Sequence, residues 1–346
     1  MNVRIESISV RLAAPFVSAL ETVEHRELLL LRLQDDEGHV GWGEAAPLPG
    51  YDNVSVEEVA AELAACREVL EHSDGTHSGR LLAQCRRLAR LPQTLAAIDL
   101  ALWDLAGRRA RAPVWQLLGA DEAPELSVNA TIAASAEDDA ATAAAAARAA
   151  GFGCVKVKVG TGEDRQRLAA VREAAGAAVA IRIDANGAWS AAEAVASLRA
   201  YEPLGIELCE EPASGLAAIA RVASATHVPL ALDESTTLPE ALDRRVCDAV
   251  CLKISTCGGI TGLVHAARRA RSAGYGVYLG STFDGPLGIA AALHAAAVIR
   301  PDRPCGLATL GLFGEDEDPL PPRDGLVAMP PGAGLGSGLT GWYGQA

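Results

Sequence analysis

The chain has 346 residues, of which 50% are hydrophobic and only 4% aromatic, and its formal net charge is −14. This length supports two packed domains with a largely aliphatic core. The acidic balance argues against a nucleic-acid partner, because nucleic-acid binding requires basic patches. No apolar stretch reaches the roughly 20 residues that a membrane span needs, and the first residues do not resemble a signal peptide.

Eight cysteines are present, and none forms a C-x-x-C pair. Cys154, Cys209 and Cys251 lie inside apolar segments, where a thiol behaves as a small hydrophobic group. We therefore expect reduced structural thiols and a cytoplasmic protein without a membrane partner. The composition does not decide the oligomeric state, so a homo-oligomer stays open.

Residues 1–124 are predicted to form an α+β domain. Alternating apolar residues predict antiparallel strands, and a helical period then predicts two long helices. The expected strands are Val3–Leu12, Arg26–Leu33 and His39–Ala45, and the expected helices are Val56–His72 and Gln93–Gly107. Strands followed by helices are typical of a separate α+β unit.

From residue 125 the pattern becomes a regular alternation of strands and alanine-rich helices. Seven consecutive βα units predict a TIM-type barrel over residues 125–313. The expected strands are Leu126–Ile132, Cys154–Gly160, Ala180–Ala185, Ile206–Glu210, Pro229–Asp233, Ala249–Ser255 and Gly276–Ser281. A doubly wound dinucleotide-binding fold is disfavoured, because no G-x-G-x-x-G motif follows the first of these strands. Residues 314–346 are expected to leave the barrel and return to the first domain.

Five charged residues lie where barrel strands are expected to end: Lys158, Asp184, Glu210, Asp233 and Lys253. Their separations are 26, 26, 23 and 20 residues, and each matches one strand, one helix and two loops. Active sites of such barrels lie at the carboxyl ends of the strands. The spacing therefore predicts a ring of charges at the catalytic rim.

Asp184, Glu210 and Asp233 are candidate metal ligands. Three converging carboxylates repel one another unless a cation compensates their charge. Carboxylate ligands favour a hard cation, Mg²⁺ first and Mn²⁺ second, whereas zinc prefers histidine or cysteine. The alternative is that each acid only caps the following helix. Because three acids occur in successive units between two lysines, the metal site is the preferred interpretation.

Lys156, Lys158 and Lys253 are candidate catalytic residues. In the segment CVKVKVG, alternation places Lys156 and Lys158 on one face of the strand and the valines on the other. The alternative is a pair of exposed strand lysines, but a buried unpaired lysine such as Lys253 in AVCLKIS would be costly. The set predicts a small carboxylate substrate held by the metal. One lysine would remove the proton α to that carboxylate, and the metal would stabilise the enediolate.

These motifs resemble the enolase superfamily, in particular its muconate-lactonizing subgroup. The matching segments are Lys156-Val-Lys158, Ile183-Asp184-Ala-Asn186, Glu210-Glu211-Pro212, Leu232-Asp233-Glu234-Ser235 and Leu252-Lys253-Ile254-Ser255, with Gly41-Trp-Gly-Glu44 in the first domain. The resemblance covers nearly the whole chain. It implies a modified (β/α)₇β barrel under a capping domain, Mg²⁺ on the three carboxylates, and Lys158 and Lys253 facing each other across the substrate. Glu210 is taken as the ligand rather than Glu211, because the family's usual form there is Glu-Gln-Pro.

The capping loop at residues 43–50 is similar to that of o-succinylbenzoate synthases, which favours a syn dehydration. N-succinylamino acid racemization, dipeptide epimerization and muconate cycloisomerization use the same framework and stay open. The Asp-x-Asp usual in dipeptide epimerases is absent from residues 298–313. The substrate-binding candidates are Phe16, Tyr51 and Asp52 in the capping loops and Asp284 after the seventh strand.

Overall fold

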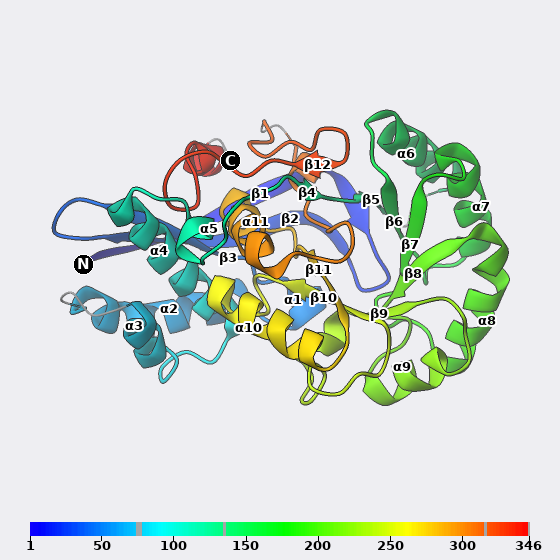
Figure 1. Ribbon diagram of the computed structural model, residues 1–346, viewed down its shortest axis with the longest axis horizontal. Helices are drawn as coiled ribbons and strands as arrows, with labels where there is room; N and C mark the ends of the chain where they lie inside the picture. Colours follow the sequence, from blue (N-terminus) through cyan, green and yellow to red (C-terminus); the bar gives the residue numbers. More distant parts are fainter. Residues whose placement is uncertain (74–77, 134–135, 315–316, 345–346) are drawn as a thin grey trace.

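The structure is a computed structural model that describes residues 1–73, 78–133, 136–314 and 317–344. Its N-terminal part is an antiparallel sheet in the order β1-β2-β3, with helices packed on it. The strands are β1 (Asn2–Val17), β2 (Thr22–Gln34) and β3 (Val40–Ala45), and the helices are α1 (Pro49–Asp52), α2 (Val56–Glu71), α3 (Ser78–Cys85), α4 (Pro92–Ala110) and α5 (Val114–Leu117). The predicted α+β unit is confirmed, and its first hairpin is longer than expected at the end that reaches the barrel (Figure 1).

Two glycines let helix α4 lie directly on strand β3. A Cβ at Gly41 would stand 2.3 Å from the carbonyl oxygen of Ala101, and one at Gly43 would stand 1.9 Å from that of Ala97. No larger residue fits these positions without moving the helix. The Gly-Trp-Gly pattern therefore has a packing reason. Helix α2 is fixed independently by a capping box between Ser55 and Glu58, an arrangement worth about 0.5–2 kcal/mol.

The second part is a curled parallel sheet of seven strands in the order β11-β10-β9-β8-β7-β6-β5. These strands are β5 (Ala130–Ile132), β6 (Cys154–Lys158), β7 (Ala180–Asp184), β8 (Ile206–Glu210), β9 (Leu230–Leu232), β10 (Ala249–Lys253) and β11 (Gly276–Gly280). Single parallel bridges join Gly306 to Gly280 and Cys305 to Val128, so this short segment takes the place of an eighth strand. The predicted (β/α)₇β barrel is confirmed.

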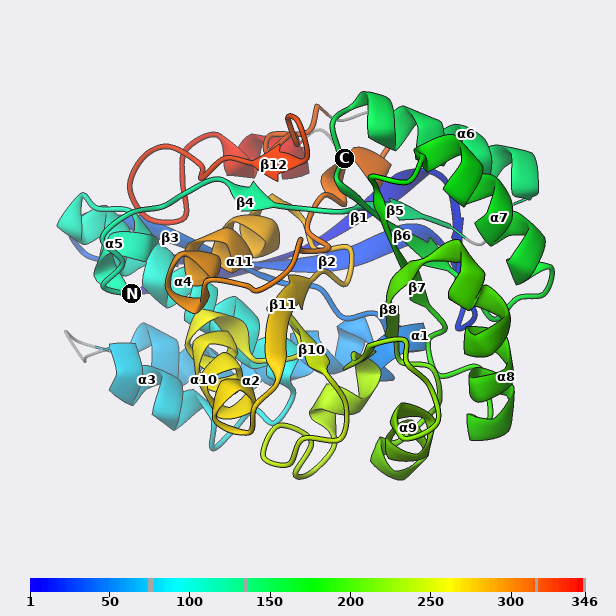
Figure 2. The ribbon, with the colours of Figure 1, turned by 45° about the vertical axis from the view of Figure 1, so that its right-hand side comes forward.

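Helices cover the outside of the barrel. They are α6 (Glu137–Ala149), α7 (Asp164–Ala175), α8 (Ala191–Tyr201), α9 (Leu216–Ala223), α10 (Gly259–Ser272) and α11 (Pro286–Ile299), with short 3₁₀ turns η1 (Glu202–Leu204), η2 (Glu234–Thr237), η3 (Leu310–Leu312) and η4 (Leu339–Gly344). Helices α6 to α9 face solvent along one end of the molecule, whereas α10 and α11 lie next to the N-terminal domain (Figures 1 and 2). Helix α11 is buried on nearly all sides, which explains its almost wholly apolar sequence.

Two sequence predictions for this region were wrong in detail. The expected strand Leu126–Ile132 is split, because β4 (Leu126–Ser127) pairs antiparallel with β12 (Leu326–Val327) in the tail and only β5 enters the barrel. The connection from β9 to β10 contains η2 and turns in place of an α-helix. Pro239 and the left-handed backbone of Glu240 (φ 64°) interrupt a helix there.

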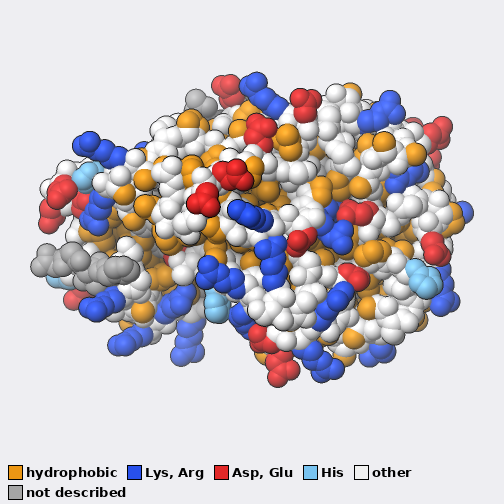
Figure 3. All heavy atoms as spheres, viewed as in Figure 1, with side chains coloured by type: hydrophobic (Ala, Val, Ile, Leu, Met, Phe, Trp, Pro, Cys, Tyr) orange, Lys and Arg blue, Asp and Glu red, His pale blue; other side chains and the backbone are white. Residues whose placement is uncertain are grey.

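The tail returns to the N-terminal domain. Gly334 accepts a hydrogen bond from Val114 N at 3.0 Å and donates one to Ala112 O at 3.0 Å. Near the end of the chain, the Tyr343 hydroxyl donates to the carboxylate of Glu44 on β3. Basic and acidic side chains both occur over the face drawn in Figure 3. No helix among the described residues has the length and apolar character needed to cross a bilayer.

The buried Glu44 should make folding stability depend on pH. Its carboxylate also accepts a hydrogen bond from Gly285 N at 2.8 Å, but burial and the neighbouring Asp284 raise the pKa of Glu44 to about 7. Between about pH 4.5 and 7 the folded chain holds a proton that the unfolded chain has released, so stability falls as pH rises through this window. The pKa difference corresponds to about 3 kcal/mol.

We expect the Glu44→Gln variant to lose this part of the pH dependence, because its side chain does not titrate. Thermal unfolding at pH 5 and pH 8 would measure it, with Glu173→Gln on an exposed position of α7 as the matched control. A pH dependence of Glu44→Gln equal to that of the parent chain would contradict the assignment.

Candidate active site

The strand ends bring the predicted rim residues together. Lys158 ends β6, Asp184 ends β7 and Glu210 ends β8, and parallel pairing places Lys158 opposite Asp184 and Asp184 opposite Glu210. Lys253 ends β10, and Asp233 directly follows β9. Three strands lie between β6 and β10, so the two lysines approach the barrel mouth from different sides.

Lys156 lies inside the barrel with Lys158, as the alternation on β6 predicts. Val155, Val157 and Val159 are fully buried on the other face. The Lys156 ammonium lies between two carboxylates, 2.9 Å from Asp184 Oδ2 and in direct contact with Glu210 Oε2. Burial disfavours its charge, but the two acids outweigh burial and raise the pKa of Lys156 well above its usual value.

Lys158 is held by polar groups at the rim. Its Nζ donates to Asp184 Oδ2 at 2.7 Å and to Asn186 Oδ1 at 3.0 Å. Burial opposes ionisation of Asp184, but the charges of Lys156 and Lys158 outweigh it and hold the pKa of Asp184 below its usual range. Asn186 in turn donates from Nδ2 to Glu234 Oε1 at 2.8 Å. Sequence reasoning gave neither Asn186 nor Glu234 a role, although both stand in the quoted motifs.

Lys253 is held from the opposite side. Its Nζ contacts Asp233 Oδ1 and donates to the Tyr51 hydroxyl at 2.8 Å, and it lies 4.2 Å from the centre of the Tyr51 ring. The Tyr51 hydroxyl donates to Asp233 Oδ1 at 2.9 Å. Burial lowers the pKa of Lys253, but Asp233 outweighs that effect and raises it above its usual value. Tyr51 therefore contacts a lysine and a carboxylate of the rim directly.

The donor set at the rim fits a divalent cation. Glu210, Asp233 and Cys251 each offer a ligand atom, and these three atoms lie within 4.8 Å of one another. Glu210 Oε1 is buried and has no hydrogen-bond partner among the described residues, as expected for an oxygen that serves a cation. Asp184 is not part of this tightest group, and its Oδ2 accepts from both Lys156 and Lys158. The sulfur of Cys251 was not foreseen as a neighbour of the carboxylates.

Glu210 and Glu211 differ in where their carboxylates point. Glu210 faces the interior and Lys156, whereas Glu211 accepts hydrogen bonds from Asp233 N at 2.8 Å and from the Ser235 hydroxyl. Burial raises the pKa of Glu211 to about 7. The geometry thus gives Glu210 the position of a ligand and Glu211 the position of a support for the loop that carries Asp233.

A pocket lies above the lysines, between the barrel and the N-terminal domain. Its walls include Lys156, Lys158 and Lys253 from the barrel, with Phe16 and Tyr51 from the N-terminal domain. Phe16 packs edge-on against Phe283, with ring centres 5.0 Å apart. Phe16 and Tyr51 therefore line the same pocket as the three lysines.

Asp52 and Asp284 do not line this pocket. The carboxylate of Asp52 accepts hydrogen bonds from Leu48 N, Val54 N and Gln93 Nε2, which fixes the turn around α1. Asp284 is 1% exposed and accepts from the backbone and hydroxyl of Thr282. The expectation that these two acids bind substrate is not supported by their positions. A loop acid can accept hydrogen bonds from nearby backbone N–H groups and so stabilise a local turn. The sequence could not distinguish this role from substrate binding.

The segment after the last full barrel strand places no acid at the rim. Asp302 is the one acidic residue in 298–313, and its carboxylate accepts from Val277 N at 2.8 Å near the start of β11. It also pairs with Arg271 at 3.3 Å. Asp302 thus belongs to the opposite end of the barrel from the lysines.

Comparisons with known proteins agree with this arrangement. Residues 1–119 match the family model "Mandelate racemase / muconate lactonizing enzyme, N-terminal domain", and residues 138–341 match "Enolase C-terminal domain-like". The chain is 32% identical over 324 residues to the L-Ala-D/L-Glu epimerase of Bacillus subtilis, covering 86% of this chain and 85% of that protein. It is 28% identical over 308 residues to the N-succinyl-L-Arg/Lys racemase of Bacillus cereus, covering 85% and 83%.

A solved structure of a relative has the same fold. The dipeptide epimerase from Cytophaga hutchinsonii, complexed with Mg and the dipeptide D-Ala-L-Val, matches with a TM-score of 0.90 and 28% identity over 98% of this chain and 97% of that chain. Relatives of this kind are isomerases and racemases. The chain belongs to the enolase superfamily, in its mandelate racemase and muconate-lactonizing group, and it is an enzyme of that group.

Proposed function

We propose that the chain is a Mg²⁺-dependent enzyme that removes the proton α to the carboxylate of a small substrate. The observation that carries this proposal is the placement of Lys158 and Lys253 on separate barrel strands, each held by a rim carboxylate beside one pocket. A pair of amines on two sides of one carbon can remove a proton from one face and return it to the other. Mn²⁺ is the second choice of cation.

Each residue of the site has its own role in the proposed reaction. Asp184, Glu210 and Asp233 hold the cation, which supplies the positive charge that stabilises the substrate's carboxylate oxygens during the reaction. Lys158, as a neutral amine, accepts the α-proton from its side of the pocket. Lys253, as an ammonium group, donates a proton on the other side. Lys156 is shared by Asp184 and Glu210, and its positive charge offsets the repulsion between those two carboxylates.

Racemization or epimerization is the net reaction that the geometry supports best, because a lysine amine stands on each side of the pocket. The named relatives, two epimerases and a racemase, act in this class. A syn dehydration of the o-succinylbenzoate synthase type is the second candidate. Residues 298–313 place no acid at the rim, so this segment offers no carboxylate for the ammonium group of a dipeptide. This favours dehydration over dipeptide epimerization.

The capping domain should choose the substrate. Apart from Ser18, Glu21 and Tyr51, the residues that the N-terminal domain contributes to the pocket are apolar: Phe16, Leu20, Val23 and Leu48. An apolar wall of this kind favours a hydrophobic group on the substrate, next to the carboxylate that the cation binds.

The metal ligands can be tested without turnover. Asp233→Asn removes one negative charge from the donor set, so we expect the Mg²⁺ dissociation constant to rise about tenfold or more. Isothermal titration calorimetry of the chelator-treated protein would measure it. Asp302→Asn at the other end of the barrel is the matched control and should bind Mg²⁺ like the parent chain. Equal affinities in the two variants would count against the ligand set.

The lysines should act on opposite configurations. We expect Lys158→Ala to slow α-proton exchange at least about a hundredfold for one configuration of the substrate. Lys253→Ala should slow exchange by a similar factor for the other configuration. Both variants should still bind Mg²⁺. Proton exchange in deuterated water, followed by NMR on N-succinyl amino acids and dipeptides, would measure both effects.

Undiminished α-proton exchange by Lys158→Ala with both configurations would refute its role as a base. A dehydratase would instead release water from its substrate, and it need not exchange protons at both configurations.

Tyr51 should matter chiefly for Lys253. Tyr51→Phe keeps the ring under the ammonium group but removes the hydroxyl that accepts from Lys253. We expect exchange on the Lys253 side to fall about tenfold and exchange on the Lys158 side to change by less than about twofold. Tyr275→Phe, whose hydroxyl bonds the backbone of Val246 and Arg244 outside the pocket, is the control. An equal loss on both sides would indicate a merely structural role.

A further inference from the structure

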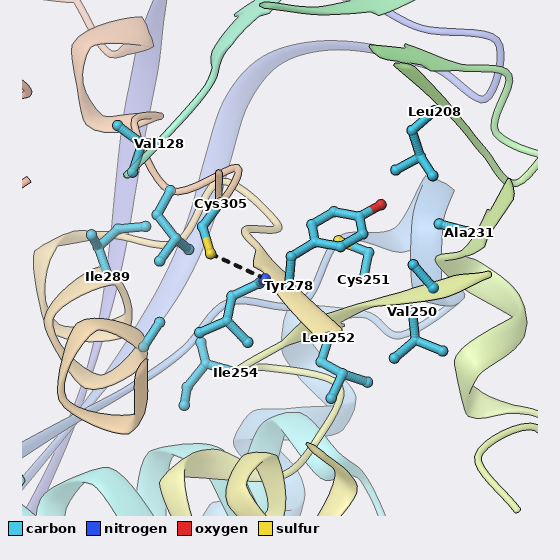
Figure 4. Close-up of a cluster of buried hydrophobic side chains, with 14 of the residues drawn as sticks. Val128, Leu208, Ala231, Val250, Cys251, Leu252, Ile254, Tyr278, Ile289 and Cys305 are labelled. Carbon is cyan, nitrogen blue, oxygen red and sulfur yellow. Dashed lines mark hydrogen bonds between the residues drawn. The ribbon is translucent and has the colours of Figure 1, made fainter. Parts of the chain in front are cut away.

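A cysteine lies directly below the proposed metal site. Cys251 stands two residues before Lys253 on β10, so both side chains point into the barrel, and the Cys251 backbone lies about 7 Å farther from the rim than that of Lys253. Its neighbour on β11 is Tyr278, and Figure 4 shows the two side chains together in the buried cluster. Both residues line a second cavity, which also has Lys156, Lys158 and Lys253 in its walls.

The sulfur is close enough to the carboxylates to share a cation with them. One ligand atom from each of Glu210, Asp233 and Cys251 lies within 4.8 Å of the others. Donor atoms around a tetrahedral zinc ion stand about 3.4–3.8 Å apart, so a shift of roughly one ångström would close the set. Glu210 itself is 0% exposed, and its Oε1 has no partner among the described residues. That free oxygen is a second sign that this point in the barrel receives a ligand.

The donor types divide cations into two classes. Mg²⁺ takes oxygen ligands in octahedral geometry and has little affinity for sulfur. Zinc and cadmium accept thiolate and carboxylate together, and divalent zinc generally binds nitrogen, oxygen and sulfur sites more tightly than lighter ions of its row. A soft cation would therefore gain a bond from Cys251 that Mg²⁺ does not gain.

We propose that Cys251, Glu210 and Asp233 form a site for a soft divalent cation of the zinc class, which overlaps the Mg²⁺ site and lies deeper in the barrel. On binding, a metal–sulfur bond forms and the thiol proton leaves to solvent, with no change of oxidation state. Because sulfur draws the ion toward the barrel floor, such an ion is displaced from the pocket where a substrate carboxylate would reach it. Zinc-class ions should accordingly inhibit the enzyme. The overlap with Mg²⁺ rests on the proposed function, whereas the sulfur ligand does not.

Cadmium provides the test, because a cadmium–thiolate bond has its own ultraviolet charge-transfer absorption. The chelator-treated protein is titrated with Cd²⁺ alone and then with Mg²⁺ in excess. We expect a band that saturates at one equivalent of Cd²⁺ and is suppressed by Mg²⁺. In Cys251→Ser the band should be lost and the affinity for Cd²⁺ should fall at least about tenfold. Cys257→Ser should keep the band, although Cys257 is the most accessible of the eight thiols.

Each other outcome overturns the proposal. A band that persists in Cys251→Ser assigns the sulfur to another cysteine, and a band that resists saturating Mg²⁺ separates the ion from Glu210 and Asp233. Cys251→Ala is a second variant in case the serine variant does not fold, and Mg²⁺ calorimetry reports whether either variant keeps its rim intact. The absorption needs no substrate, so it can be read even if no carboxylate exchanges a proton and the proposed function fails.

Discussion

Opposite charges buried at one barrel rim hold this site together. Lys156 bridges Asp184 and Glu210, Lys158 holds Asp184 from above, and Lys253 pairs with Asp233. Any of these groups alone would cost several kcal/mol to bury, and together they compensate one another. The rim therefore tolerates its charges only as a set. Under the proposed function, the carboxylates cannot pair fully with the lysines and also serve a cation. Metal binding and the proton affinity of the lysines must then be linked through the same oxygens.

The capping domain takes part in this set instead of only covering it. Asp52 fixes the turn around α1 through Leu48, Val54 and Gln93, and that turn presents Tyr51 to Lys253. At the far end of the chain, the Tyr343 hydroxyl donates to Glu44, which also accepts from the backbone N–H of Gly285 at the N-cap of α11. Contacts from three parts of the sequence thus converge around one barrel mouth. A change in the capping loop can reach a lysine without touching the barrel.

The sequence predicted what periodicity and spacing control. Strand alternation on β6 placed Lys156 and Lys158 on one face, and the repeat of βα units placed three carboxylates on neighbouring strand ends. It failed where a single residue has two equally good local uses. Asp52 and Asp284 look like exposed loop acids in sequence, yet both are satisfied by nearby backbone groups. Tyr51 was expected to bind substrate, and its contact with Lys253 spans 202 residues, a distance that no local pattern encodes. The same holds for Cys251, which sequence reasoning treated as a small core residue.

The division between barrel and cap also explains why the chemistry is easier to infer than the substrate. Lysines and carboxylates must stand at fixed strand ends to act on an α-proton, so their spacing is constrained by the barrel itself. The wall opposite them is built from Phe16, Leu20 and Val23 in the first hairpin and Leu48 near α1, where many side chains satisfy the same backbone. In agreement with this, the relatives named above are an L-Ala-D/L-Glu epimerase and an N-succinyl-L-Arg/Lys racemase, which differ in substrate. Under the proposed function, the barrel of this chain sets the reacting carbon, and two loops of the capping domain select the rest of the substrate.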